Sequence, residues 1–158
     1  MTRETIGFTY TTYIVSTPGK VFEAITKPDL ARRYWGHENV SDWKPGSSWQ
    51  HIRANDERTV ELVGKVVEVS PPTRLVITWA NASQASDPAS YSRVTFELEE
   101  YEAMVRLTVS HDDLEAGSGM ANGIKKGWPI VLSSLKSFLE TGQAIDVFAK
   151  PRASELAA

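Results

Sequence analysis

The chain has 158 residues, of which 41% are hydrophobic and 23% charged, and its net charge at pH 7 is -3. These values are ordinary for a globular domain with one core, and no apolar run approaches the length of a membrane span. There is no basic block for contact with nucleic-acid phosphates, and without cysteine there can be no disulfide, thiolate metal site or thiol nucleophile. The N-terminus lacks the apolar segment of a secretory signal, so we expect a single cytoplasmic domain over 1–158, with its core at about 9–142.

The first part of the chain predicts a strand followed by two short helices. Residues 8–17 are dense in β-branched and aromatic side chains, which favours an extended strand. Thr17 is a candidate N-cap, and Pro18 can occupy the first turn of a helix that continues over 19–26. A second proline ends that helix and begins another short one over 28–35.

The middle of the chain predicts an antiparallel sheet built from consecutive strands. Several segments are rich in β-branched and aromatic residues, and most of them alternate apolar and polar side chains. The short turn-rich segments between them favour a meander. The expected strands are 47–53, 59–69, 74–80, 92–100 and 103–111.

Residues 124–142 predict one long amphipathic helix. Trp128 and Leu132 belong to a set of apolar side chains three or four positions apart, the spacing of a single helical face. Residues 112–123, which include the glycine-rich sequence GSGMANG, are expected to form a loop or broken turn before the helix. Pro129 is then expected in the first turn of the helix, where its missing N–H is tolerated.

This order of elements predicts an α+β fold. The sheet must bury its apolar face, and only the long C-terminal helix is large enough to cover it. We therefore expect a curved antiparallel sheet wrapped around that helix, with a cavity between the two. Residues 143–158 are expected to form a short extension and a frayed tail.

The segment SDWKPGSSWQ, residues 41–50, predicts a turn between two early strands. Residues 44–47 place proline second and glycine third, which is typical of a type II turn. Trp49 and His51 should then share the cavity-facing side of the second strand. Trp43 should cover the sheet edge or the short helices.

The chain resembles the SRPBCC or START-like helix-grip superfamily, and within it the homologues of the activator of heat-shock protein 90 ATPase. The resemblance implies a helix-grip fold with a cavity. It does not imply one activity, because the superfamily includes lipid carriers, polyketide cyclases, hormone receptors, toxin–antitoxin partners and chaperone regulators. The stretches that carry it are TTYIVSTPGKVFEAITKPDLARRYWG, SDWKPGSSW, GKVVEVSPPTRLVITW, VTFELEE, VRLTVSH and GWPIVLSSLKSFLETG.

The histidines are the first candidates for acid/base chemistry at neutral pH. His111 ends a predicted strand in register with apolar residues, so it is expected to point into the cavity near its mouth. His51 shares a face with Trp49. Each could contact a ligand or act as a general base, or could instead be a buried histidine bonded to a neighbour. His51 with His111 is the one acid/base pair that the sequence offers.

Neither a metal site nor a nucleophile is indicated. Potential ligands such as His37, Asp42 and Asp112 do not occur at the spacings typical of protein metal sites, and the acidic run HDDLE lacks the EF-hand pattern. There is no GxSxG elbow, Walker lysine or GxGxxG frame. We expect no metal and no cofactor, and the sequence leaves catalysis open while favouring its absence.

The aromatic side chains are the more informative signal, since five tryptophans and five tyrosines are present. Such rings combine a large apolar area with a polar tip, which suits the wall of a ligand cavity, although each ring alone could simply pack in the core. The residues expected to line the cavity are Phe22, Tyr34, Trp35, Trp49, His51, Trp79, Phe96, His111, Trp128 and Leu132.

Three functions are compatible with these features. The first is a protein that binds a small apolar or aromatic ligand. The second is a cyclase- or hydrolase-like enzyme, which would need an acid/base pair in the cavity. The third is a protein-interaction module that regulates a chaperone, as the family name implies. No nucleic-acid partner is expected, and the edge strands of an open sheet could pair in a homodimer.

Overall fold

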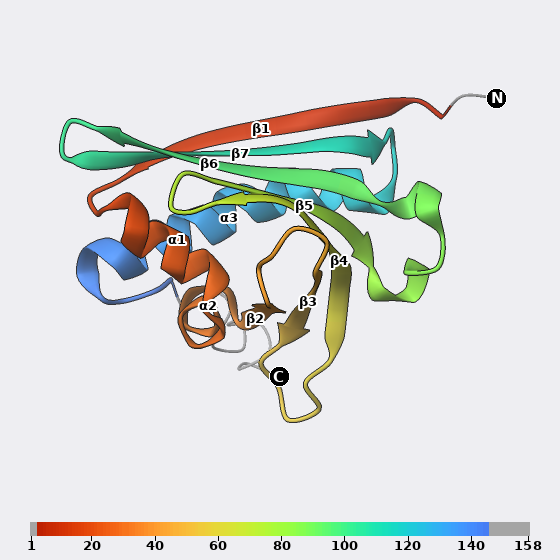
Figure 1. Ribbon diagram of the computed structural model, residues 1–158, viewed down its shortest axis with the longest axis horizontal. Coiled ribbons are helices and arrows are strands. Elements are labelled where there is room, and N and C mark those ends of the chain that lie inside the picture. Colours follow the sequence, from red (N-terminus) through yellow and green to blue (C-terminus); the bar gives the residue numbers. More distant parts are fainter. Residues whose placement is uncertain (1–2, 146–158) are drawn as a thin grey trace, which may run out of the picture.

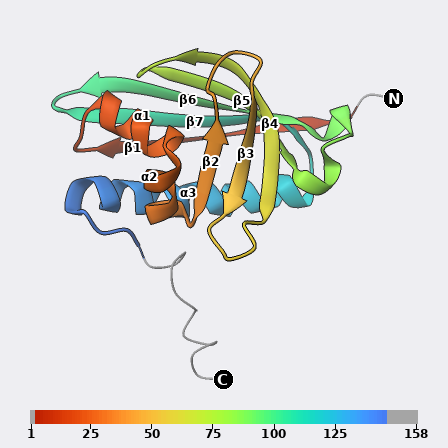
Figure 2. The same cartoon turned by 60° about the horizontal axis from the view of Figure 1, so that its bottom comes forward.

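The structure, a computed structural model, describes residues 3–145 (Figure 1). They form one antiparallel seven-stranded sheet in the order β1-β7-β6-β5-β4-β3-β2, with α3 running along one face of it (Figures 1 and 2). The strands are β1 (Thr5–Ile14), β2 (His37–Ser41), β3 (Ser48–Arg53), β4 (Val60–Ser70), β5 (Arg74–Asn81), β6 (Ser92–Tyr101) and β7 (Met104–Glu115). The helices are α1 (Pro18–Thr26), α2 (Pro28–Trp35) and α3 (Gly119–Thr141), with 3-10 turns η1 (Ala82–Gln84) and η2 (Pro88–Ser90). The predicted α+β helix-grip architecture is confirmed.

The two short helices begin and end where the sequence signals predict. The Thr17 side chain accepts a hydrogen bond from the Lys20 N–H at 3.3 Å, so it caps α1 as expected. A proline begins each helix, and Gly36 closes α2 in the left-handed conformation that glycine adopts without strain. Trp35, the last residue of α2, is buried.

The predicted turn over residues 44–47 is also confirmed. The Ser47 N–H donates to the Lys44 carbonyl at 2.9 Å, and Gly46 has the positive φ of 88° that a type II turn requires at its third residue. Trp43 covers the short helices, since its Nε1–H donates to the Thr26 carbonyl at 3.0 Å. The turn joins β3 to a short strand, β2, whose bounds were not predicted; two of its five residues, Glu38 and Asn39, are buried polar side chains that hide the alternation.

The start of the last helix differs from the prediction. β7 continues to Glu115 and α3 begins at Gly119, so the glycine-rich residues expected to form a loop make up the first turns of the helix. The Ser118 hydroxyl accepts a hydrogen bond from the Ala121 N–H at 3.1 Å and caps this end. Tertiary packing and the cap outweigh the low helix propensity of glycine. Pro129 consequently lies inside the helix and not in its first turn.

The sheet is curved, and the curvature separates one end of it from α3. Register shifts interrupt the pairing of β1 with β7, β3 with β4 and β4 with β5, and such bulges bend a strand. Within the described residues α3 packs closely on β1, β7 and α2, whereas its contacts with β3, β4 and β5 are sparse. A space therefore remains between α3 and that end of the sheet.

Two predictions about the limits of the chain remain to be placed. The frayed tail expected from residue 143 lies, from residue 146 onward, outside the described residues. Among residues 3–145 there is no helix with the length and apolar character needed to cross a bilayer.

Candidate functional site

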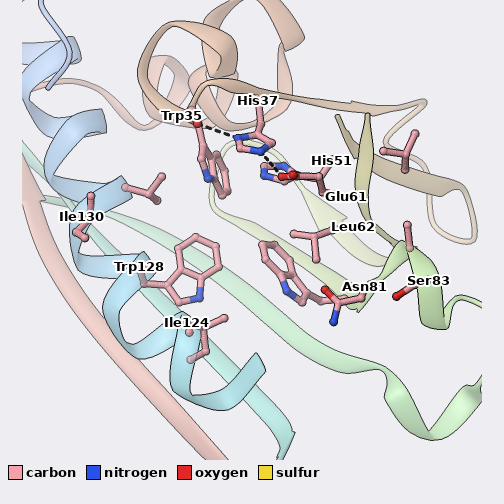
Figure 3. A pocket seen from close by; sticks show the side chains of 16 residues that line it. Trp35, His37, His51, Glu61, Leu62, Asn81, Ser83, Ile124, Trp128 and Ile130 are labelled. Atoms are coloured by element: carbon pink, nitrogen blue, oxygen red, sulfur yellow. Dashed lines mark hydrogen bonds and ion pairs between the residues drawn. The ribbon is translucent and has the colours of Figure 1, made fainter. Parts of the chain in front are cut away.

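A cavity of about 800 Å³ occupies the space between α3 and the β3–β5 end of the sheet (Figure 3). Its volume lies within the range usual for small-molecule sites. It is lined by Trp35 from α2, His37 and His51 from β2 and β3, Val60, Glu61 and Leu62 from β4, Trp79 and Asn81 from β5, Ala82 and Ser83 from η1, and Gly123, Ile124, Gly127, Trp128, Ile130 and Val131 from α3.

Two glycines of α3 explain why the helix does not fill this space. Gly123 and Gly127 are four residues apart, so they lie on the same face one turn apart, and both border the cavity. A Cβ atom added to either one would meet nothing within 4 Å. Glycine inside a helix is about 1 kcal/mol less favourable than alanine. The helix therefore carries two destabilising residues that close packing does not require, and their missing side chains leave room.

Three tryptophans supply most of the aromatic wall. The ring centroid of Trp128 lies 5.7 Å from that of Trp35 and 5.4 Å from that of Trp79. The indole N–H of Trp128 donates to His111, and that of Trp79 contacts the sulfur of Met120 at 3.3 Å. Because these two polar tips are already paired inside the protein, the rings offer mainly apolar surface to the cavity.

His51 has a fixed orientation and a fixed tautomer. The amide nitrogen of the buried Asn39 donates to the Ile25 carbonyl at 2.8 Å, which leaves its Oδ1 as an acceptor. That oxygen lies 2.7 Å from Nδ1 of His51, so Nδ1 carries the proton and donates. In the neutral ring, Nε2 is then an acceptor with a free lone pair.

His37 and Glu61 form an ion pair beside His51 (Figure 3). Nδ1 of His37 lies 2.9 Å from the Trp35 carbonyl, and Nε2 lies 2.5 Å from Glu61 Oε1, so both ring nitrogens have a hydrogen-bond partner. Burial raises the pKa of Glu61, but hydrogen bonds and charges from His37 and Arg53 outweigh burial and hold that pKa below its ordinary value. The His37 ring is stacked on His51 with centroids 4.3 Å apart.

This environment keeps His51 neutral. Burial first, and then the positive charge of His37, lower the pKa of His51 well below its ordinary value. A ring that resists protonation is a poor proton acceptor in catalysis but remains a good hydrogen-bond acceptor. The cavity thus combines an apolar aromatic wall with one oriented acceptor.

The expectation that His111 points into the cavity near its mouth is wrong. The side chain is fully buried behind Trp79 and Trp128, and burial lowers the pKa of His111 to about 4. Its Nδ1 accepts from Trp128 at 3.0 Å, and its Nε2–H faces the Ser92 hydroxyl at 2.8 Å. Trp79 packs against both His111 and His51, and the structure records no direct contact between the two histidines. The predicted acid/base pair does not form.

The structure divides the ten predicted cavity residues between the wall and the core. Those that line the cavity are Trp35, His51, Trp79 and Trp128. Those buried in the surrounding core are Phe22, Tyr34, Trp49, Phe96, His111 and Leu132. Trp49 leaves the cavity because its Nε1–H reaches across the sheet to the Thr78 carbonyl at 2.7 Å. Ligand contact by any of the ten stays a prediction.

Sequence reasoning missed the residues that define the other walls. Gly123 and Gly127 could have been recognised from the sequence, since small residues four apart lie on one face of a helix. Such a face either packs closely against a neighbouring element or leaves space beside the helix. His37, Glu61 and Leu62 could not have been recognised in this way, because their positions depend on the pairing of β2, β3 and β4. Among residues 3–145 no cluster of three or more histidine, aspartate, glutamate or cysteine side chains could hold a metal ion.

Comparison with known proteins identifies the family at the level of the sequence. The model of the family described as Activator of Hsp90 ATPase homolog 1-like protein matches residues 16–140. No curated protein matches the chain.

Comparison of structures finds the same fold in several bacterial and eukaryotic proteins. The Aha1 dimer of Colwellia psychrerythraea has a TM-score of 0.73 at 21% identity, over 88% of this chain and 99% of that one. Protein MLL2253 of Mesorhizobium loti has a TM-score of 0.71 at 27% identity, over 85% and 97%. PFC0360w of Plasmodium falciparum, an HSP90 activator, has a TM-score of 0.64 at 22% identity, over 77% and 86%.

Proposed function

The chain belongs to the family of Activator of Hsp90 ATPase homolog 1-like proteins, and from this premise we propose that it binds a small apolar or aromatic molecule in the cavity between α3 and the sheet. The observation that carries the proposal is a cavity of about 800 Å³ whose wall includes Trp35, Trp79 and Trp128. An interior of close-packed side chains rarely leaves such a volume.

The two glycines of α3 favour a cavity that binds a ligand over a cavity that is only a packing defect. Gly123 and Gly127 each weaken the helix by about 1 kcal/mol relative to alanine, and a methyl group would fit at either position. A helix selected only for stability would fill that space. The two glycines are accounted for if the space itself has a use.

A titration with naphthalene tests the proposal. Three of the five tryptophans border the cavity, so a bound aromatic molecule should change the intrinsic tryptophan emission, and calorimetry should give a matching affinity. Gly127→Phe should place a ring in the cavity and abolish binding. Gly19→Ala, a helical glycine in α1 away from the cavity, is the matched control and should bind like the wild type.

Circular dichroism must show that the Gly127→Phe variant is folded. The proposal fails if naphthalene leaves the emission and the heat signal unchanged in the wild type. It also fails if the folded Gly127→Phe variant binds as well as the wild type. Native mass spectrometry of the purified protein adds an independent test for a co-purified apolar molecule.

Regulation of a chaperone is the second candidate. It is favoured by the likeness of the fold to an Aha1 dimer and to an HSP90 activator, at 21% and 22% identity. If it applies, adding the chain to the Hsp90 of the same cell should raise the rate of ATP hydrolysis. An unchanged rate of ATP hydrolysis would count against this function. If the rate does rise, comparing Gly127→Phe with the wild type would show whether the effect depends on the cavity.

An enzyme of the cyclase or hydrolase kind is less well supported. His51 and His111 make no contact, and the pKa of each is lowered by burial, so neither is matched to proton transfer at neutral pH.

Within the described sheet β1 and β2 are the edge strands, which supports the proposal that two copies of the chain pair in a homodimer. Light scattering would measure the oligomeric state. A cytoplasmic location is likewise proposed, and cell fractionation would test it.

A further inference from the structure

The hydrogen bonding of the three histidines leaves one nitrogen unused. His37 bonds through both ring nitrogens, to the Trp35 carbonyl and Glu61. His111 also bonds through both, to Trp128 and Ser92. His51 bonds through Nδ1 alone, so its Nε2 has no partner within the described residues.

This unpaired nitrogen borders the cavity. Residue His51 is only 3% exposed, yet every fully buried side-chain nitrogen and oxygen in the described part of the chain has a hydrogen-bond partner. Nε2 must therefore retain some accessible surface, and the cavity is the space that the ring lines. In Figure 3 the ring lies beside Trp35, above the space that Trp128 and Leu62 border.

The nitrogen is an acceptor and not a donor. The Oδ1 of Asn39 accepts a hydrogen bond from Nδ1–H of His51, so the single proton of the neutral ring stays at Nδ1, and the Asn39 amide nitrogen donates to the Ile25 carbonyl, which fixes the orientation of the amide. Rotation of the ring would break this bond inside the core and leave a buried oxygen without a donor, which costs about 1–3 kcal/mol. The lone pair of Nε2 is therefore held in one place.

We propose that the cavity selects an aromatic molecule that carries a hydroxyl group, and that this hydroxyl donates its hydrogen bond to Nε2 of His51. The inference rests on the proposed function, because it names the chemistry of the ligand in the same cavity. A site that pairs a buried acceptor with a ligand hydroxyl discriminates against the analogue that lacks it, since the acceptor then stays unsatisfied.

A polar atom of Trp35, close to the His51 ring, makes the choice of probe important. The Nε1–H of Trp35 has no hydrogen-bond partner among the described residues, and its ring centroid lies 4.7 Å from that of His51. Trp35 can only donate, whereas Nε2 of His51 can only accept. A ligand oxygen without a proton can therefore bond to Trp35 but not to His51.

Three probes of similar shape separate these contributions: 2-naphthol, which donates and accepts, 2-methoxynaphthalene, which only accepts, and naphthalene, which does neither. With the wild-type protein we expect 2-naphthol to bind about tenfold more tightly than 2-methoxynaphthalene, the worth of one well-formed hydrogen bond. In His51→Leu the two affinities should become equal. Long-range proton–nitrogen spectra of isotope-labelled protein should also show that Nε2 of His51 carries no proton. The resonance of this nitrogen should shift on adding 2-naphthol but not on adding naphthalene.

The outcomes distinguish this inference from the function on which it rests. If naphthalene, 2-methoxynaphthalene and 2-naphthol bind the wild type equally, the cavity binds ligands but the role of His51 is refuted. If none of them binds, both proposals fail. Spectra that place the proton on Nε2 also refute the inference, and they do so without any variant, which matters if His51→Leu does not fold.

Discussion

The indole N–H of Trp128 donates a hydrogen bond to Nδ1 of His111 at 3.0 Å, which ties α3 to β7 inside the core. An indole nitrogen can only donate, so Nδ1 must be unprotonated and Nε2 must carry the proton. The Nε2–H then donates to Ser92, whose hydroxyl donates to the Trp79 carbonyl at 3.1 Å. A wall residue of the cavity is thus held by a histidine that must stay neutral.

Stability should therefore decrease as the pH falls from about 6.5 toward 4. Burial lowers the pKa of His111 from 6.5 to about 4, so between these values the unfolded chain binds more protons than the folded one. The contribution of His111 is complete above the unfolded pKa and is lost as the pH falls through this window, by about 3 kcal/mol in all. The pKa of His51 is lowered as well, which acts in the same direction. Urea unfolding at pH 7, 6 and 5 measures the effect.

A control distinguishes the histidines from the carboxylates. The hydrogen bond from Arg58 lowers the pKa of Glu38 from 4.5, so the loss of stability due to that carboxylate lies mainly below pH 4.5, outside the range from pH 7 to 5 that is measured. His111→Phe should be less stable than the wild type at pH 7 but should lose less on going to pH 5. A His111 signal that titrates near pH 6.5 in the folded protein would contradict the prediction.

Gly64→Ala should destabilise the fold by about 3 kcal/mol, as expected for overpacking a tightly packed site. Gly64 pairs with Trp49 across β3 and β4, and an added Cβ would lie 1.9 Å from the Thr78 carbonyl and 2.4 Å from Nε1 of Trp49. The methyl group would thus disrupt the hydrogen bond between Trp49 and Thr78. Thermal unfolding followed by circular dichroism measures the loss, and a melting temperature equal to that of the wild type would show that the sheet can open there.

Gly127→Ala should have the opposite sign and stabilise the protein by about 1 kcal/mol. The added methyl meets nothing within 4 Å, and alanine is the better helix former. Denaturant titration gives the change in the free energy of unfolding. A destabilised Gly127→Ala variant would mean that the space beside α3 is smaller than the structure has it, which would weaken the proposed function too.

Leu135→Ala should cost about 2–5 kcal/mol, the range for truncating a buried leucine. The helical period predicts that this side chain faces the sheet, and the structure has it fully buried. Ile130, on the same helix but 45% exposed, is the matched control, and Ile130→Ala should cost far less. Similar losses for the two variants in denaturant titrations would mean that the face of α3 is wrongly assigned.

The architecture could be predicted from the sequence because the signals for its helices and turns are local. Thr17 and the two prolines define α1 and α2, residues 44–47 define a turn, and the spacing of Trp128, Leu132 and Leu135 defines the buried face of α3. Each signal depends on side chains within a few positions of one another. The signals failed where tertiary packing overrides propensity, at the glycine-rich start of α3 and along β2.

The residues that line the cavity could be predicted only in part. Trp35, His51, Trp79 and Trp128 were expected at its wall and lie there, but Trp49 and His111 were expected there on the same grounds and lie in the core. The direction of each ring depends on a hydrogen bond to a residue far along the chain. Trp49 turns toward Thr78, and His111 binds Trp128.

The order of residues alone determined the α+β class, the succession of strands and helices and the buried face of α3, since periodicity and capping are properties of neighbouring residues. Only the tertiary structure decided where the sheet leaves the helix, which rings face the space between them and which histidine nitrogen stays unpaired. These features depend on bulges, strand register and contacts such as Asn39 with His51, twelve residues apart. Local patterns in the sequence cannot specify these features, because they exist only after distant segments have packed together.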